Sequence, residues 1–475
     1  MNRFSKITLL SICTSMIAMP AIANDDTTAV MQELFEIYAV TPEVGSVDDA
    51  SRSTRWNDVK ITGADGGAVF HLPWVEVSQN LLAGYTITMA DQMTVSGDLP
   101  DGEQMSGTFG TENFEIAVSG GEGARTFDMT FDQMSGDMRA GDEFEMKMVF
   151  GAGQAKSTLA NEIVTGAFDY PKLDLQYNLN VEGQNSDVEM NMTGMTGKFR
   201  SPVIGGVAFA DYQKLWDASE SYFADYVIPQ MNMNMNMASP AGPVSVSATM
   251  GASTGRLAST EGVVSMTGNA TDIQYNVSAM GMPPMKVTLD ESVTNFAVPL
   301  DNVDAVKPAA LKMGLTGLEL DPMIWAMFDP QGLLPKEKAN LDIDISAGMK
   351  WVQKMDSFDP MQMATGLPVQ FEDVKINALN LNAMGADLKT DGAFSIDTSN
   401  FPPAASGAAN VSIKGVNDLM GKLTTAGLLP VQYSMMAKGM MGVYFKQGGE
   451  GVDHLTSQIM IAPNCAITSN GLPLK

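Results

Sequence analysis

Cysteine and histidine are almost absent from this chain of 475 residues, which holds two of each. Cys13 lies in the apolar N-terminal stretch, so a chain that loses this stretch keeps Cys465 alone and forms no internal disulfide. The histidines, His71 and His454, are far apart in sequence, a spacing more typical of ordinary residues than of a joint site. The sequence therefore predicts no cofactor and no metal site.

Basic residues are also scarce, with 28 Lys and Arg against 55 Asp and Glu and a net charge of −27. Nucleic acids and anionic lipid headgroups are themselves polyanionic, so binding to either of them through charge is disfavoured. Beyond the N-terminus, no apolar run approaches the roughly 18 residues of a membrane-spanning helix. We expect a globular chain without a transmembrane segment and without a nucleic-acid partner.

Residues 1–23 have the three parts of a secretory signal peptide. Arg3 and Lys6 supply the positive start, residues 7–19 form an apolar core, and residues 21–23 form a small-x-small cleavage site. Lipid attachment at Cys13 is disfavoured because a bulky residue precedes it. We expect cleavage between Ala23 and Asn24 and export to the periplasm, with the extracellular medium as the alternative location.

From residue 56 onward, apolar residues recur at every second position, which is the period of a strand with one dry and one wet face. In the clearest run, polar residues separate the apolar ones, which are Leu173, Leu175, Tyr177, Leu179 and Val181. Short spacings between such runs favour antiparallel pairing of consecutive strands. We predict a mainly β fold with some α, in which a long, twisted antiparallel meander forms a groove.

Methionine is abundant, at 38 residues, and one stretch alternates it with asparagine. In an extended chain this stretch presents four thioethers on one face, from Met231, Met233, Met235 and Met237. Thioethers bind Cu(I), but alternate residues of a strand lie about 6.6 Å apart, too far for neighbours to chelate one ion without bending the strand. We interpret these methionines, with the run at 173–181, as an adaptable apolar lining.

Helices are expected near the N-terminus, in the middle and near the C-terminus. Helical spacing or boundary signals mark residues 25–40, 212–228 and 321–328, and a pair of helices within 416–445. The tetrapeptide Gly-Leu-Leu-Pro separates this pair at 427–430 and recurs at 332–335, which predicts a repeated helix-turn unit. We expect one elongated domain over residues 24–475, with its weakest seam at 229–243.

Three short motifs resemble functional signatures but lack the context that their chemistry requires. Residues 251–255 match the nucleophile elbow G-x-S-x-G, yet a strand pattern follows Ser253 where the elbow needs a helix. A phosphate loop needs glycine before its lysine, whereas Ala155 stands there in residues 151–158. Residues 301–304 lack the glycine and the terminal glutamate of an EF-hand loop. We expect no catalytic residues and no enzymatic activity.

Residues 415–445, with the Gly-Leu-Leu-Pro hinge and a methionine-rich second helix, resemble the C-terminal part of a secreted family of Gram-negative bacteria. That family is catalogued as a domain of unknown function, and the resemblance brings no catalytic residues. More distantly, the ending Asn-Gly-x-Pro-Leu at 470–474 after a β-meander resembles the AsmA-like periplasmic proteins. Their curved sheets with an apolar groove are tied to outer-membrane lipid handling, but this chain lacks their N-terminal membrane anchor.

These observations favour a non-catalytic periplasmic protein that binds or shields an apolar ligand, such as lipid acyl chains, or that contacts an envelope protein. The alternative is a structural or interaction protein of the envelope whose helices cover the sheet completely, so that no ligand binds. An outer-membrane barrel is more remote, because a terminal aromatic strand and aromatic girdles are missing. A serine hydrolase acting through Ser253 is also remote, because a strand pattern follows the serine and the chain offers only His71 and His454 as a base.

Overall fold

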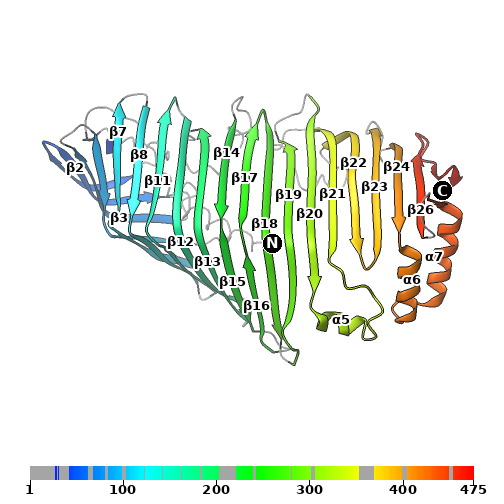
Figure 1. The fold of residues 1–475 in the computed structure, drawn as a ribbon. Helices are drawn as coiled ribbons and strands as arrows, with labels where there is room; N and C mark the ends of the chain where they lie inside the picture. Colours follow the sequence, from blue (N-terminus) through cyan, green and yellow to red (C-terminus); the bar gives the residue numbers. More distant parts are fainter. Residues whose placement is uncertain are drawn as a thin grey trace. The chain divides into compact units, whose positions relative to one another are not determined.

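The computed structural model is mainly β, as predicted, with antiparallel strands and short helices toward the C-terminus (Figure 1). It describes residues 27–28, 30–31, 42–62, 68–80, 84–98, 103–121, 124–141, 143–161, 163–181, 184–202, 221–238, 242–279, 281–300, 305–351, 369–397, 404–448 and 453–474. The chain forms two compact units, the first with residues 1–215, 220–248 and 279–282 and the second with the remainder. The described residues of the 229–243 seam belong to the first unit.

The first unit contains strands β1 to β15 and most of β16. Their bounds are β1 (Glu43–Ala50), β2 (Ser53–Thr62), β3 (Ala68–Gln79), β4 (Tyr85–Met89), β5 (Gln92–Asp98), β6 (Gln104–Glu112), β7 (Glu115–Gly121), β8 (Ala124–Phe131), β9 (Gln133–Ala140), β10 (Phe144–Phe150), β11 (Gly153–Ala160), β12 (Ile163–Val181), β13 (Gln184–Pro202), β14 (Tyr222–Ile228), β15 (Gln230–Met237) and β16 (Val244–Met250).

The second unit contains the later strands and the helices α5 to α7. Their bounds are β17 (Ser253–Thr260), β18 (Val263–Ala279), β19 (Met285–Pro299), β20 (Lys307–Leu320), α5 (Pro322–Phe328), β21 (Ala339–Trp351), β22 (Val369–Ala383), β23 (Ala386–Asp397), β24 (Ala404–Lys414), α6 (Val416–Thr425), α7 (Val431–Tyr444), β25 (Lys446–Gln447), β26 (His454–Ile461), β27 (Ile467–Ser469) and β28 (Leu472–Pro473).

In the first unit, many strands come in two halves that lie end to end along one longer neighbour. β11 pairs with residues 163–169 of β12, and β10 pairs with residues 173–179 of the same strand. β14 and β15 share β13 in the same way, and β4 and β5 share β3. We call two such half-strands, taken together, a two-part strand. Each two-part strand pairs with the strands that precede and follow it in sequence, so the first unit is an antiparallel meander.

The side-chain alternation shifts by one residue where the two halves of a strand meet. In β2, buried Trp56 precedes Asp58 and buried Val59 follows it, so the apolar positions change from even to odd numbers. Asp58 has φ of 50°, outside the strand conformation. Such an irregularity bends a strand and redirects its side chains, and here it leaves apolar residues of both halves in one cluster. We call such a position a reversal point.

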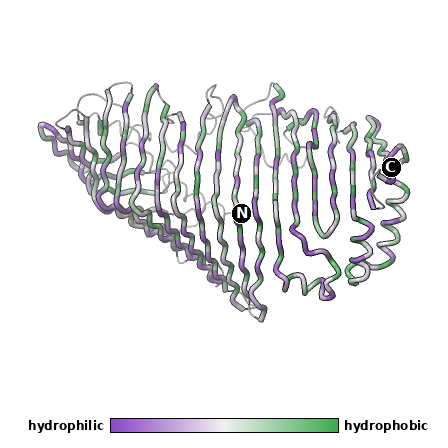
Figure 2. Tube along the Cα trace, viewed as in Figure 1, coloured by the Kyte–Doolittle hydropathy of each residue, from purple (hydrophilic) through white to green (hydrophobic). Residues whose placement is uncertain are grey.

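Reversal points recur across both units, at residue types that suit irregular backbone. Asn113, between β6 and β7, has φ of 52°, and Gly194 in β13 has φ of 72°. In the second unit, Asp272 in β18 and Gly317 in β20 have φ of 52° and 74°. Figure 2 shows hydrophilic and hydrophobic residues interspersed along the strands. Other reversal points in the first unit are Pro73, Asp132, Pro171 and Pro229.

The core of the first unit lies between the two sets of half-strands. Tyr170, before the reversal point of β12, packs against Phe150 of β10 with ring centroids 5.5 Å apart. Val30 and Met31 are fully buried in the same cluster. Residues 27–28 and 30–31 are helical, which agrees with the N-terminal helix predicted over 25–40, whose other residues lie outside the described ranges. The N-terminal segment therefore fills part of the core.

The helix predicted over residues 212–228 is wrong where the structure describes it. Residues 222–228 form the strand β14, which pairs antiparallel with β13 between Thr196–Val227 and Arg200–Phe223. The aromatic residues at helical spacing also have high strand propensity, and the free edge of β13 satisfies their backbone groups. Residues 212–220 lie outside the described ranges. The predicted helices at 321–328 and within 416–445 are confirmed as α5, α6 and α7.

Both Gly-Leu-Leu-Pro copies follow a helix, and both glycines are left-handed, with φ of 65° at Gly332 and 76° at Gly427. After α6, the N–H groups of Leu428 and Leu429 donate to the carbonyl of Leu423. After α5, the acceptor for the corresponding N–H groups is a buried carboxylate. Asp329 accepts hydrogen bonds from the N–H groups of Leu333 and Leu334, the two leucines that follow Gly332. A second helix follows only the later copy, and β21 follows the earlier one.

Candidate apolar binding surface

The predicted methionine face is part of an apolar ladder that runs across neighbouring strands of the first unit. Met231 and Met233 of β15 lie directly opposite Met192 and Met190 of β13. Residues directly opposite in an antiparallel pair present their side chains on the same face, at Cβ distances of about 5 Å. These four thioethers therefore form one continuous patch, which we call the methionine ladder.

The predicted run on β12 continues this face. Leu173 and Leu175 lie opposite Met192 and Met190, so they extend the methionine ladder by one strand. The next strand, β10, places its own apolar residues opposite the run. The register pairs between β10 and β12 that join two apolar residues are Phe150–Leu173, Met148–Leu175, Met146–Tyr177 and Phe144–Leu179.

Burial on this face varies from residue to residue, and most of its side chains are half-buried. Met146 on β10 is 1% exposed, whereas Leu175 and Tyr177 on β12 are half-buried. Met235 and Met237 are also half-buried, and they pair with the positions of Val188 and Ser186 on β13. The side chain of Val181 is outside the described set. The register thus brings the described residues of the predicted set onto one face, where they are half-buried.

The opposite face of the same strands is polar. Asn191 donates to Asp174 over 2.9 Å, and Lys172 pairs with Asp174 at 2.5 Å. The hydrogen bond from Lys172 lowers the pKa of Asp174, against the opposing effect of burial, and Asn191 adds to the lowering. The structure therefore has one apolar and one acidic, hydrated face in the β12–β13 region.

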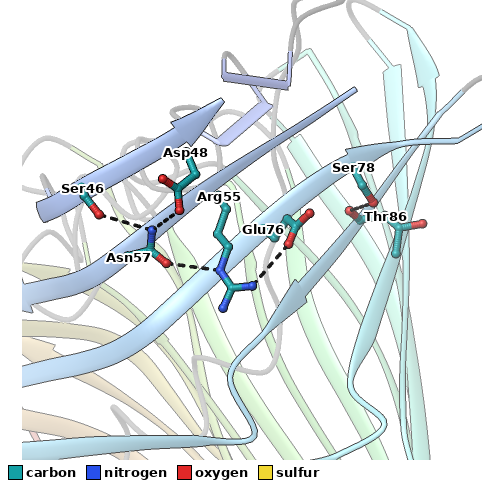
Figure 3. A network of polar contacts seen from close by, with 7 residues as sticks. All are labelled: Ser46, Asp48, Arg55, Asn57, Glu76, Ser78 and Thr86. Carbon is teal, nitrogen blue, oxygen red and sulfur yellow. Dashed lines mark hydrogen bonds and ion pairs between the residues drawn. The ribbon is translucent and has the colours of Figure 1, made fainter. Parts of the chain in front are cut away.

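A second network of polar side chains lies across β1 to β4 (Figure 3). There Asn57 donates to Asp48 over 2.8 Å, and Arg55 donates to Asn57 and pairs with Glu76 at 3.8 Å. Arg55 also lies over the ring of Trp74, 4.1 Å from its centroid. Exposed pairs of this kind add little to stability, but they keep this side of the strands hydrated.

The second unit carries its own apolar row, and this row is exposed. Leu257 of β17 lies opposite Met266 of β18, which lies opposite Phe296 of β19, which lies opposite Leu311 of β20. Their exposed fractions are 53%, 50%, 42% and 37%, respectively. A contiguous exposed apolar row is uncommon on a soluble monomer and is typical of an interaction or ligand surface. The sequence analysis did not single out this row.

One buried cation interrupts the apolar core of the first unit. Arg125 of β8 is 3% exposed, and its guanidinium lies 5.6 Å from the ring centroid of Tyr85. Within the described part of the chain, neither Nε nor Nη1 of Arg125 has a hydrogen-bond partner. A buried charge with incomplete hydrogen bonding is costly, so we expect this position to weaken the core.

The motifs weighed in the sequence do not come together as a reactive centre in the described residues. Ser253 begins the strand β17, so the strand-turn-helix of a nucleophile elbow is absent there. His71 pairs with Asp58 at 2.7 Å, and His454 with Ser412 at 3.0 Å. Residues 301–304 lie outside the described ranges, and Cys465 is an exposed free thiol. Among the described residues, no cluster of three or more His, Cys, Asp or Glu could hold a metal ion.

Comparison with models of known protein families gives no match, and no curated protein matches the chain. Within the described ranges, no helix combines the length and the apolar character needed to cross a bilayer.

Proposed function

We propose that this chain is a non-catalytic envelope protein, exported to the periplasm, that binds lipid acyl chains along the apolar face of its strands. The methionine ladder carries the proposal, because it places flexible thioethers next to one another on an incompletely covered face. Methionine side chains adapt to apolar partners of irregular shape, which suits flexible acyl chains better than a rigid ligand.

The exposed row of the second unit supports the same function. Leu257, Met266, Phe296 and Leu311 present apolar area to water on four neighbouring strands. Covering this area with an acyl chain is favourable by roughly 25 cal/mol per Å² of apolar surface removed from water. Each unit therefore offers a surface on which an acyl chain gains free energy.

A structural protein without a ligand is the second candidate, and the N-terminal part of the first unit favours it locally. Val30 and Met31 are fully buried against Ile87 and Phe127, so side chains already fill that part of the core. The proposed acyl contacts are therefore confined to the β12–β15 end of the first unit and to the exposed row of the second.

Binding of a fluorescent fatty acid to the delipidated full-length protein tests the proposal. We expect saturable binding, displaced by unlabelled fatty acid, and co-purifying lipid in native mass spectra of protein taken from cells. Absence of both signals would contradict acyl-chain binding and leave the structural alternative.

A further inference from the structure

The C-terminal helix α7 has an unusual outward face. Its side toward the protein is made by Ser434, Ala437, Met441 and Tyr444, which recur at helical spacing and are buried or half-buried. A helix on the surface of a soluble protein normally turns polar residues outward. On α7 the only polar side chains on the exposed side, apart from the Tyr433 hydroxyl, are those of Gln432 and Lys438.

The exposed side chains of α7 are large and apolar. Met435 is 64% exposed, Val431 59% and Met436 58%, and Tyr433, Met440 and Val443 are exposed to a similar degree. The helix α7 lies against α6, and the carbonyl of Tyr444 at its end accepts hydrogen bonds from Ser469 and Asn470. Its exposed apolar side chains belong to neither core cluster of the described residues. Figure 1 shows α6 and α7 side by side near the C-terminus.

The charge of this region is opposite to that of the chain. Residues 419–448 contain three lysines, Lys422, Lys438 and Lys446, and no aspartate or glutamate, although the chain as a whole carries 55 acidic residues. Lys422 is paired with Asp418 at 2.7 Å, so the unbalanced cations are Lys438 and Lys446. Lys438 lies one turn from Met435 on the exposed side of α7.

We propose that the α6–α7 hairpin, residues 416–444, docks on the surface of an anionic lipid bilayer. In this arrangement the exposed apolar side of α7 lies in the headgroup region, and Lys438 extends along the helix to reach the phosphates. Within this hairpin the carboxylate of Asp418 is paired with Lys422, which leaves Lys438 as the unbalanced charge, and a partly apolar surface with an excess cation fits an anionic membrane. The two properties reinforce one another, since apolar burial and attraction to anionic lipid both contribute to binding at an interface.

The net charge of −27 opposes an approach to anionic lipid at low salt. At physiological ionic strength, however, charges more than about 8 Å apart are largely screened, so the nearest side chains dominate. Docking is thus expected to be strongest at intermediate salt, where the repulsion from the whole chain is screened and the attraction of the nearest lysine remains. The docking does not depend on the acyl-chain contacts proposed above.

Flotation of the full-length protein with phosphatidylglycerol–phosphatidylcholine vesicles, compared with pure phosphatidylcholine vesicles, tests the docking. We expect about tenfold more protein bound to the anionic vesicles, and about a tenfold loss of binding for both Met435→Ser/Met440→Ser and Lys438→Glu. The matched control is Met282→Ser, an exposed methionine in the turn between β18 and β19, which should bind like the wild type.

The proposal is overturned if the wild type does not float with anionic vesicles or if the α7 variants float equally well. It is also overturned if light scattering shows a dimer that Met435→Ser/Met440→Ser dissociates, because α7 would then contact a second copy. Unchanged thermal unfolding confirms that the variants are folded. Unchanged fatty-acid binding by the variants separates this site from the acyl-chain surface, so failure of either proposal can be recognised alone.

Discussion

Pro171 of β12 faces Gly194 of β13, between the register pairs Tyr170–Met195 and Lys172–Thr193. Both strands change their side-chain alternation at this point. In β12 the residue is a proline, which cannot donate a backbone hydrogen bond, and in β13 it is a glycine in the left-handed conformation. The pairing of the two strands resumes at once on either side. Two irregular residues in matching positions therefore let both strands redirect their side chains without losing register.

Gly194→Ala should destabilise the protein by about 1–2 kcal/mol, because alanine resists the left-handed conformation that Gly194 adopts. An added Cβ would also lie 3.2 Å from Cγ of Pro229. Urea unfolding measures the loss. Gly268→Ala is the control, since its added Cβ would meet only a carbonyl oxygen at 3.9 Å, and this variant should be as stable as the wild type or more so. Equal effects would contradict the role of the reversal point.

Asp329→Asn should lower stability in a pH-dependent way. Burial raises the pKa of Asp329, but hydrogen bonds from the N–H groups of Leu334 and Leu333, together with Lys336, outweigh this and hold the pKa below its usual value. A carboxyl with a lowered pKa stabilises the fold above its unfolded-state pKa, and this stability is lost as the pH falls through the folded-state pKa.

The difference in thermal midpoint between wild type and Asp329→Asn should therefore be largest near neutral pH and shrink below about pH 4. Asp321→Asn is the control, because Asp321 caps α5 through one hydrogen bond to the N–H of Met323 and asparagine caps a helix equally well. A difference that does not change with pH would show that the charge of Asp329 is not the stabilising feature.

Arg125→Met should leave the free energy of unfolding unchanged or raise it by about 1 kcal/mol or more, since a buried ion with incomplete hydrogen bonding is replaced by an apolar side chain of similar length. Arg139→Met provides the comparison. Arg139 is 62% exposed and paired with Glu145, so its loss should change stability by less than about 0.5 kcal/mol. Destabilisation by Arg125→Met of more than about 2 kcal/mol would indicate that the guanidinium has a stabilising partner.

Met233→Lys should weaken fatty-acid binding about tenfold, because it places a charge in the methionine ladder and removes apolar contact area. The adjacent Asn234→Lys places the same side chain on the polar face, opposite Glu189, and should leave binding unchanged. Fluorescence titration distinguishes the two variants. If both weaken binding equally, the effect does not come from the apolar face.

The two-residue period was sufficient to predict the β fold and the shared face of residues 173–179 and 231–237, because each of these runs lies within one half of a strand. It could not predict Tyr222–Ile228, where aromatic spacing suggested a helix and the edge of β13 selected a strand. The reversal points left a readable signal, since the alternation shifts at Pro171, at Gly194 and at Asp272. The exposed row of the second unit left none, because it depends on the register between four consecutive strands, which the alternation within each strand does not determine.

The pairing of each two-part strand with its neighbours in sequence bears on how the first unit is assembled. Because synthesis runs from the N-terminus, one partner of each new strand there has already been synthesised when the strand appears. The sheet can therefore form by sequential addition of strands, because each hairpin pairs with an edge that is already formed. No strand needs a partner that is distant in sequence. Such growth also means that hairpins could be gained or lost during evolution without rearranging the strands before them.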